Sequence, residues 1–214
     1  MTTQEILNIL QSDIHSVVFA TLDEHGLPQT CVIDLMLADD DGLYFLTAKG
    51  KAFYRRLMAK PFVSLSGMKG GDTLSTTAIS VRGAVRSIGT KRLAEIFEKN
   101  PYMAKIYPTE KSREALEVFQ LYKGQGEYFD LAQLPPYRQS FSFGGERIQE
   151  NGYRIISEKC IGCQGCRSVC PVNCISSTIP RSIDTTHCLH CGNCLSICPV
   201  GAVERIGAAS QATK

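Results

Sequence analysis

The chain has 214 residues, with 23 lysines and arginines against 21 aspartates and glutamates, a net charge of +2 and 10 cysteines. A charge this close to balance, without a basic patch interleaved with aromatic residues, argues against a nucleic-acid partner. No apolar run approaches the length needed to cross a membrane, so we expect no membrane partner and a cytoplasmic location where thiols stay reduced.

The N-terminal segment has the pattern of an amphipathic helix. Thr2 and Glu5 are spaced as a capping box. Apolar residues then recur at helical spacing, at Ile6, Leu7, Leu10 and Ile14. We therefore predict a helix over residues 1–14.

Alternating apolar segments separated by turn residues follow, and they predict antiparallel strands. The strands are expected at 15–23, 27–38, 43–47, 62–66 and 75–88, and a last hairpin joins 118–122 to 127–131 through a turn at 123–126. Short helices are predicted at 51–60 with Phe53, Leu57 and Met58 inward, at 90–99 with Thr90 as its cap, and at 112–117. Six or seven antiparallel strands with few helices predict a barrel.

The composition changes near residue 150, because only one of the cysteines lies before that point. The stretch at 135–152, rich in proline and glycine, is therefore predicted to link a domain at 1–134 to a second domain at 153–214. Tyr137, Phe141 and Phe143 lie within this linker. A free tether would be Gly/Ser-rich or charged, so we expect the linker to pack against the protein.

Two cysteine runs of identical spacing occupy the second domain. Each has the form C-x₂-C-x₂-C-x₃-C-P, and their members are Cys160, Cys163, Cys166, Cys170 and Pro171, then Cys188, Cys191, Cys194, Cys198 and Pro199. This run ligates [4Fe–4S] clusters in bacterial proteins, and its fourth cysteine binds the other cluster. Structural zinc sites favour two close pairs with a longer gap, and disulfides belong to oxidising compartments. The sequence therefore predicts two [4Fe–4S] clusters.

Crossover ligation assigns each cysteine to a cluster. One cluster is held by Cys160, Cys163, Cys166 and Cys198, and the other by Cys188, Cys191, Cys194 and Cys170. Cys174 falls where the second run has Ala202, so we predict that it is a packed thiol and not a ligand. Cys31, in a strand-like segment, is predicted to be a small buried apolar residue. Residues 153–206 resemble the two-cluster bacterial ferredoxins, which implies a small α+β domain.

The first domain resembles a known family in residues 19–28, 43–51 and 61–65 and in the order of its strands and helices. It is similar to the FMN-binding split barrel of the pyridoxamine 5′-phosphate oxidase-like superfamily over about residues 3–135. The resemblance implies a homodimer with FMN at its interface. The expected fold is therefore mainly β, a split β-barrel with short helices, plus a small C-terminal α+β ferredoxin-like domain.

The resemblance also implies which residues bind the flavin. The phosphate is expected near a hydroxyl, two ammonium groups and a glycine amide that opens a helix, at Thr47, Lys49, Gly50 and Lys51. The isoalloxazine ring is expected against the backbone of Val32, Ile33 and Asp34, with Ser64, Ser66 and Gly67 on the neighbouring strand. The alternatives are a solvated lysine pair and an edge-strand aspartate that discourages aggregation.

These features predict an FMN-dependent oxidoreductase in which the ferredoxin-like domain relays single electrons to or from the flavin, for reduction of a small organic substrate. We expect a redox partner protein or a small-molecule electron donor or acceptor. Residues 30–34 do not match the arginine-rich flavin strand of the vitamin B6 oxidase, so oxidation of pyridoxamine phosphate is not predicted. No G-x-G-x-x-G fingerprint supports direct use of NAD(P)H. The alternative is an electron-transfer or redox-sensing module without a substrate of its own.

Overall fold

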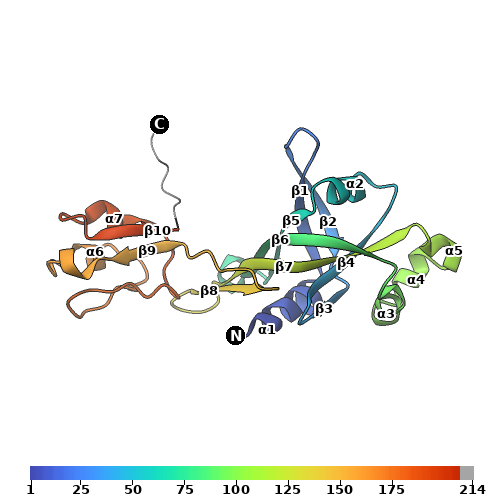
Figure 1. Cartoon of the computed structure of the whole chain (residues 1–214). Helices are drawn as coiled ribbons and strands as arrows, with labels where there is room; N and C mark the ends of the chain where they lie inside the picture. The colour runs from blue at the N-terminus through green and yellow to red at the C-terminus, as the bar shows by residue number, and fades with distance from the viewer. Residues whose placement is uncertain (208–214) are drawn as a thin grey trace. The chain divides into compact units, whose positions relative to one another are not determined.

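The computed structural model describes residues 1–207, and the chain divides into two compact units (Figure 1). The first unit comprises Met1–Gly71, Thr77–Tyr128 and Phe141–Ile148, and the second comprises Asp72–Thr76, Phe129–Ser140 and the chain from Gln149 onward. Residues 208–214 of the predicted second domain lie outside the described residues. No helix within residues 1–207 combines the length and the apolar character needed to cross a membrane.

An antiparallel sheet is the framework of the first unit. Its order is β2-β1-β5-β6-β7-β4-β3, with β8 paired to β7. The strands are β1 (Ser16–Leu22), β2 (Pro28–Asp34), β3 (Leu37–Asp39), β4 (Gly42–Ala48), β5 (Phe62–Lys69), β6 (Thr77–Gly89), β7 (Leu116–Asp130) and β8 (Tyr137–Phe143). The expectation of a mainly β fold with a small C-terminal domain is confirmed.

Side-chain alternation along the strands creates the core of this sheet. Val17 and Phe19 of β1 are buried, whereas Val18 between them is exposed. The rings of Phe19, Phe45, Phe53 and Phe119 pack against one another with centroids 4.7 to 6.0 Å apart. The β4 strand is buried on both faces, because Tyr44 and Leu46 on its other side join a cluster with Ile96, Phe97 and Met103.

Short helices connect or cover the strands. They are α1 (Thr3–Asn8), α2 (Ala52–Ala59), α3 (Leu93–Lys99), α4 (Met103–Ile106) and α5 (Glu110–Arg113), with a 3-10 turn at Thr73–Ser75. The predicted capping box of Thr2 and Glu5 is present at the start of α1, and the helix continues as a π-helical segment at Ile9–Ile14. Met58 was expected to face inward but is 54% exposed, because Phe53 and Leu57, four residues apart, already define the buried face of α2.

The strand predicted at 27–38 divides into β2 and β3. Leu35 still donates its amide to His15 O at 2.8 Å, but the amide of Met36 donates to Tyr44 O at 2.8 Å. The chain therefore leaves β1 and joins β4 at this point. Backbone hydrogen-bond partners from distant segments make this break, and the local sequence pattern does not show it.

Two predicted helix boundaries were wrong. The α3 helix begins after Arg92, which has a left-handed backbone at φ 65°, so Thr90 is not its cap. The helix predicted at 112–117 ends at Arg113, and Leu116 already belongs to β7, where it pairs with Ala48 of β4. Strand pairing with β4 overrides the local helical tendency there.

The predicted hairpin with a turn at 123–126 was also wrong, because β7 runs without a break from Leu116 to Asp130. The glycines in it allow close packing rather than a turn. A Cβ on Gly126 would lie 2.3 Å from Ser80 O and 2.6 Å from Phe141 Cζ, and one on Gly124 would lie 2.8 Å from Arg82 O. Glycine in a strand interior marks such an approach of a neighbouring chain segment.

Part of the predicted linker is a strand, since residues 137–143 form β8. Phe141 and Phe143 are buried and Tyr137 is half-buried, which agrees with the expectation that the aromatic residues pack. Phe141 also contacts the Gly126 position of β7. The sequence did not predict this strand, because its pairing partner β7 was expected to be interrupted by a turn at 123–126.

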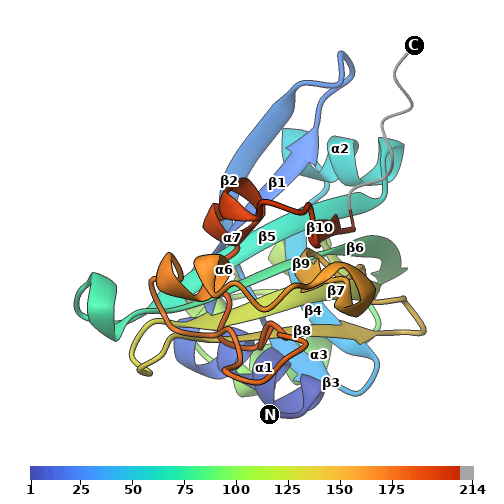
Figure 2. The same cartoon turned by 90° about the vertical axis from the view of Figure 1, so that its left-hand side faces the viewer.

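The second unit holds both cysteine runs. Its elements are β9 (Gly152–Ile155), a 3-10 turn (Ser157–Lys159), α6 (Gly165–Ser168), α7 (Asn193–Ile197) and β10 (Val203–Ile206), and β9 pairs with β10 antiparallel (Figure 2). Its small core consists of Tyr153, Cys166, Ile175, Cys194 and Val203. Two short strands and two one-turn helices thus enclose only a small apolar core.

Candidate functional site

The cysteines of the second unit line two separate hollows. The first hollow is lined by Cys160, Cys163, Cys166 and Cys198. The second is lined by Cys170, Cys188, Cys191 and Cys194, and also by Cys174, which lies outside the predicted ligand set. Of the eight run cysteines, each hollow thus takes three from one run and the fourth from the other run. This is the grouping that crossover ligation requires.

Each run places its cysteines by the same local structure. A residue with a left-handed backbone, Gln164 at φ 68° or Gly192 at φ 83°, turns the chain into a short helix. The third cysteine, Cys166 or Cys194, lies on that helix and is buried. The second cysteine of each run is exposed, so each hollow has one edge toward solvent.

Backbone amides surround the sulfurs of the first hollow. Amides of Arg181 and Gly162 lower the pKa of Cys160. Burial raises the pKa of Cys198, but several amides outweigh it and leave this pKa below its ordinary value, with Ala202 N 3.2 Å from Cys198 Sγ. Thiolate donors with amides directed at them fit an iron–sulfur cluster.

A buried cation, Arg181, is a residue that sequence reasoning missed. It is 4% exposed, borders the first hollow, and donates to Ser176 O at 2.9 Å and Gly162 O at 3.3 Å. Its charge adds to the backbone amides that lower the pKa of Cys160. At Cys166 burial outweighs the same charge and raises the pKa. No motif reveals it, because its carbonyl partners are defined only by the fold.

In the first unit, the residues predicted to hold a phosphate lie between β4 and α2. Thr47 is buried, and within residues 1–207 its Oγ1 has no hydrogen-bond partner. Lys51 precedes α2, and no side chain caps the amides of this helix. A buried hydroxyl without a partner, an ammonium group four residues later in the chain and helix amides without a side-chain cap suit an anionic phosphate. Lys49 instead donates to Glu114 O at 3.2 Å, and Gly50 is exposed.

The residues predicted to face the flavin ring share a sheet face only in part. Val32 pairs with Val18, and Val18 pairs with Ser66, so these residues form one row across β2, β1 and β5. Ser64 lies on the same exposed face of β5. Gly67 does not, because a Cβ there would point at Ile14 and Val17 on the core side. Ile33 likewise alternates away from Val32 along β2.

Asp34 belongs to a polar network that the sequence did not reveal. Its carboxylate accepts hydrogen bonds from Ser16 Oγ at 2.5 Å and Tyr102 Oη at 2.9 Å, and His15 Nε2 lies 3.6 Å away. Burial raises the pKa of Asp34, but these three groups outweigh it and lower the pKa below its usual value. Burial and the same carboxylate raise the pKa of Tyr102. The network can therefore hold a proton on the Tyr102 hydroxyl beside the strand predicted to face the flavin.

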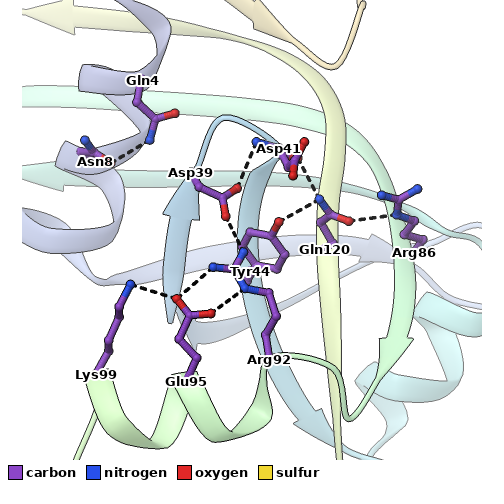
Figure 3. A network of polar contacts seen from close by, with 10 residues as sticks. All are labelled: Gln4, Asn8, Asp39, Asp41, Tyr44, Arg86, Arg92, Glu95, Lys99 and Gln120. Carbon is purple, nitrogen blue, oxygen red and sulfur yellow. Dashed lines mark hydrogen bonds and ion pairs between the residues drawn. The ribbon is translucent and has the colours of Figure 1, made fainter.

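A second polar network holds α3 against β3 and β4 (Figure 3). Arg92 binds Asp39 and both carboxylate oxygens of Glu95, and its guanidinium lies 4.2 Å from the centre of the Tyr44 ring. Gln120 connects to this network through Tyr44 Oη at 3.0 Å and accepts from Arg86 Nε at 2.9 Å. None of these residues was predicted as part of a site.

The chain matches two family models. Residues 2–128 match the pyridoxamine 5′-phosphate oxidase family, and residues 159–202 match the 4Fe-4S dicluster domain. No curated protein matches the chain.

Solved structures resemble part of the chain. A NimC/NimA family protein from Clostridium acetobutylicum is 18% identical with a TM-score of 0.55, covering 65% of this chain and 92% of that one. A heme binding protein from Mycobacterium smegmatis is 14% identical with a TM-score of 0.52, covering 66% and 58%. A pyridoxamine 5′-phosphate oxidase-related, FMN binding protein from Nostoc punctiforme is 12% identical with a TM-score of 0.44, covering 64% and 90%. The chain belongs to the pyridoxamine 5′-phosphate oxidase family, in a form fused to a 4Fe-4S dicluster domain.

Proposed function

We propose that this protein is an FMN-dependent oxidoreductase in which a two-cluster ferredoxin-like domain relays single electrons to or from the flavin, for reduction of a small organic substrate. The supporting observation is the presence, in one chain, of a barrel of this family and two cysteine-lined hollows with the crossover composition. A bound FMN would interconvert two-electron and one-electron transfer, which is the step that joins an organic substrate to iron–sulfur clusters.

The proposed roles of the chain's own residues follow from their positions. Thr47, Lys51 and the first amides of α2 bind the phosphate, while Val32, Ser64 and Ser66 contact the ring. Tyr102, held by Asp34, keeps a proton near that ring. The eight crossover cysteines hold the clusters, in a domain at 153–214 that a segment at 135–152 joins to the barrel at 1–134.

We further propose a homodimer, a redox partner protein or small-molecule donor, and FMN as the barrel's cofactor. The exposed face of β1, β2 and β5 supports the dimer, because it presents Val18, Leu22, Val32, Phe62 and Met68 to solvent. Isolated monomers rarely leave so many large apolar groups together on one sheet face.

Truncation after Glu150 tests the electron relay. The remaining chain keeps the whole first unit, so we expect it to fold and bind FMN, but to lose reduction of the flavin by a one-electron donor protein. Rapid-mixing spectroscopy of the intact and truncated proteins measures this directly. Equal rates of flavin reduction in both proteins would show that the clusters are not its electron source.

A second candidate function is an electron-transfer or redox-sensing module without its own substrate. The similarity to a heme binding protein supports this candidate, because a protein of similar fold binds a prosthetic group other than FMN. The absorption spectrum of the anaerobically purified protein separates the two. Stoichiometric flavin bands support the oxidoreductase, whereas a haem band or an empty barrel supports the module.

A further inference from the structure

A fifth cysteine borders the second hollow. Cys174 lines this hollow together with the four predicted ligands, and its Sγ lies 3.5 Å from the Sγ of Cys170. The thiol is half-buried and packs against the core cluster of its unit. At the first hollow, within the described part of the chain, the corresponding neighbour is Ala202, which carries only a methyl group.

The positions of Cys174 and Ala202 are equivalent in backbone as well as in sequence. Each ends a five-residue turn that starts at the fourth cysteine of a run and continues through proline and valine. The residue before each has a left-handed backbone, Asn173 at φ 54° and Gly201 at φ 60°. The amides of these two residues donate to the carbonyls of Cys170 and Cys198, both at 3.3 Å. What differs at the edge of the hollow is therefore a thiol in place of a methyl group.

We propose that Cys174 is a reserve ligand of the second cluster, able to replace Cys170, whereas the first cluster has no substitute for Cys198. The inference rests on the proposed two-cluster function. Cys174 would bind iron as the thiolate and release its proton to water, so that one iron–thiolate bond replaces another and no electron is gained or lost.

The geometry permits this exchange without rebuilding the fold. A change between staggered χ1 rotamers moves a cysteine sulfur by about 3 Å, which is close to the 3.5 Å that separates the two sulfurs. The backbone of Cys174 is meanwhile fixed, because its carbonyl accepts from the amide of Asp184 at 2.8 Å and Ile175 bridges to Ile183. The competing role is a thiol that donates a hydrogen bond to the Cys170 sulfur and never binds iron.

Iron content of the full-length protein, purified without oxygen, tests the proposal. The intact protein should carry about eight irons, as two [4Fe–4S] clusters require. We expect Cys170→Ala and Cys174→Ala each to keep this content, and the double variant Cys170→Ala/Cys174→Ala to lose about half of it. The repeat supplies a matched control, since Cys198→Ala should lose about half and Cys198→Ala/Ala202→Cys should regain it.

Electron paramagnetic resonance of the reduced variants shows whether the other cluster survives, and hence whether the domain still folds. Equal iron loss in Cys170→Ala and in the double variant would overturn the proposal. So would full iron retention in the double variant, or no recovery when Ala202→Cys is added to Cys198→Ala. Intact protein with only about four irons would instead contradict the two-cluster function itself.

Discussion

At the scale of single residues, the Thr47 hydroxyl is the most specific pointer to a ligand in the barrel. Burying a hydroxyl without a hydrogen-bond partner destabilises the fold by about 1–3 kcal/mol. Such a group is therefore expected where a bound ligand supplies the missing hydrogen bond. The sequence singled out Thr47 only by resemblance to a family. The structure adds the physical reason, which is a buried hydroxyl without a hydrogen-bond partner, in a strand followed by a helix whose amides have no side-chain cap.

Thr47→Val should therefore weaken FMN binding without weakening the fold. The isosteric methyl removes one hydrogen bond to the phosphate, which corresponds to about 1.5 kcal/mol or roughly tenfold in Kd. The free energy of unfolding of the flavin-free protein should stay the same or rise. Fluorescence titration with FMN measures the affinity, with Thr47→Ser as the variant that retains it. Unaltered affinity in Thr47→Val would remove this residue from the phosphate site.

Glu95 gives a prediction on acid stability. Hydrogen bonds from Arg92, and then from Lys99, lower the pKa of Glu95 from 4.5 to about 2. A lowered carboxyl pKa contributes stability above the unfolded value, and this contribution is lost as the pH falls from about 4.5 to about 2. In Glu95→Gln, the free energy of unfolding should fall less steeply between pH 4.5 and about 2. At neutral pH the substitution should lower it by at most about 1 kcal/mol, because the ion pair of Glu95 with Arg92 is partly solvated.

Urea denaturation followed by circular dichroism at a series of pH values measures the Glu95 effect. Glu98→Gln is the matched control, because Glu98 lies on the same helix and is exposed. Identical pH profiles for the two variants would mean that the ionised Glu95 carboxylate does not stabilise the fold.

At the scale of elements, the β7 strand shows why a glycine pattern can mislead. Glycines at positions 124 and 126 with Lys123 resemble a turn, yet the neighbouring backbone and the Phe141 ring occupy the space where their side chains would be. Only the positions of β6 and β8 distinguish a turn glycine from a packing glycine. Pairing with β6 and β8 keeps β7 extended through residues 123–126, which were predicted as a turn.

Gly126→Ala should destabilise the barrel. Its Cβ would lie 2.3 Å from Ser80 O, which is a backbone atom that cannot move without bending β6. Overpacking of this kind costs about 1–3 kcal/mol, which thermal unfolding of the flavin-free protein detects. Gly50→Ala is the control, since a Cβ there meets no atom within 4 Å. A Gly126→Ala protein as stable as the Gly50→Ala protein would argue against the unbroken β7.

At the scale of the whole molecule, the exposed sheet face offers a test of the proposed homodimer. Val18 and Val32 are cross-strand partners on that face and are 44% and 66% exposed. Val32→Glu places a charge where the second copy would exclude water, and we expect the dimer Kd to rise at least about 100-fold. Because the residue is exposed in the single chain, folding should not suffer.

Analytical ultracentrifugation of the flavin-bound protein measures this association. Ile106→Glu is the control, because Ile106 is 61% exposed on α4 and does not lie on the sheet. A Val32→Glu protein that sediments as the wild type does would exclude this face from the interface, and a monomeric wild type with tightly bound FMN would exclude the dimer.

The sequence alone determined the features that depend on local chemistry. The spacing of the cysteine runs is a local signal, because three of the four predicted ligands of each cluster lie within seven residues. Alternation along β1 or β5 follows from the two-residue period of a strand. The mainly β fold and its C-terminal domain were therefore predictable. Thr47, Lys49 and Lys51 were predicted as phosphate ligands only from the family resemblance. The local sequence does not distinguish a phosphate site from a solvated lysine pair.

Tertiary structure alone decided the features that join distant segments. The unbroken β7, the division of residues 27–38 and the strand at 137–143 depend on which backbone lies alongside. The partners of Asp34 and the carbonyls around Arg181 come from segments far away in the chain. Nothing in the sequence distinguishes Cys174 from other cysteines. The turn at Asn173 brings its sulfur to the edge of the second hollow. The hydrogen-bonded backbone, and not the residue type, determines where that side chain lies.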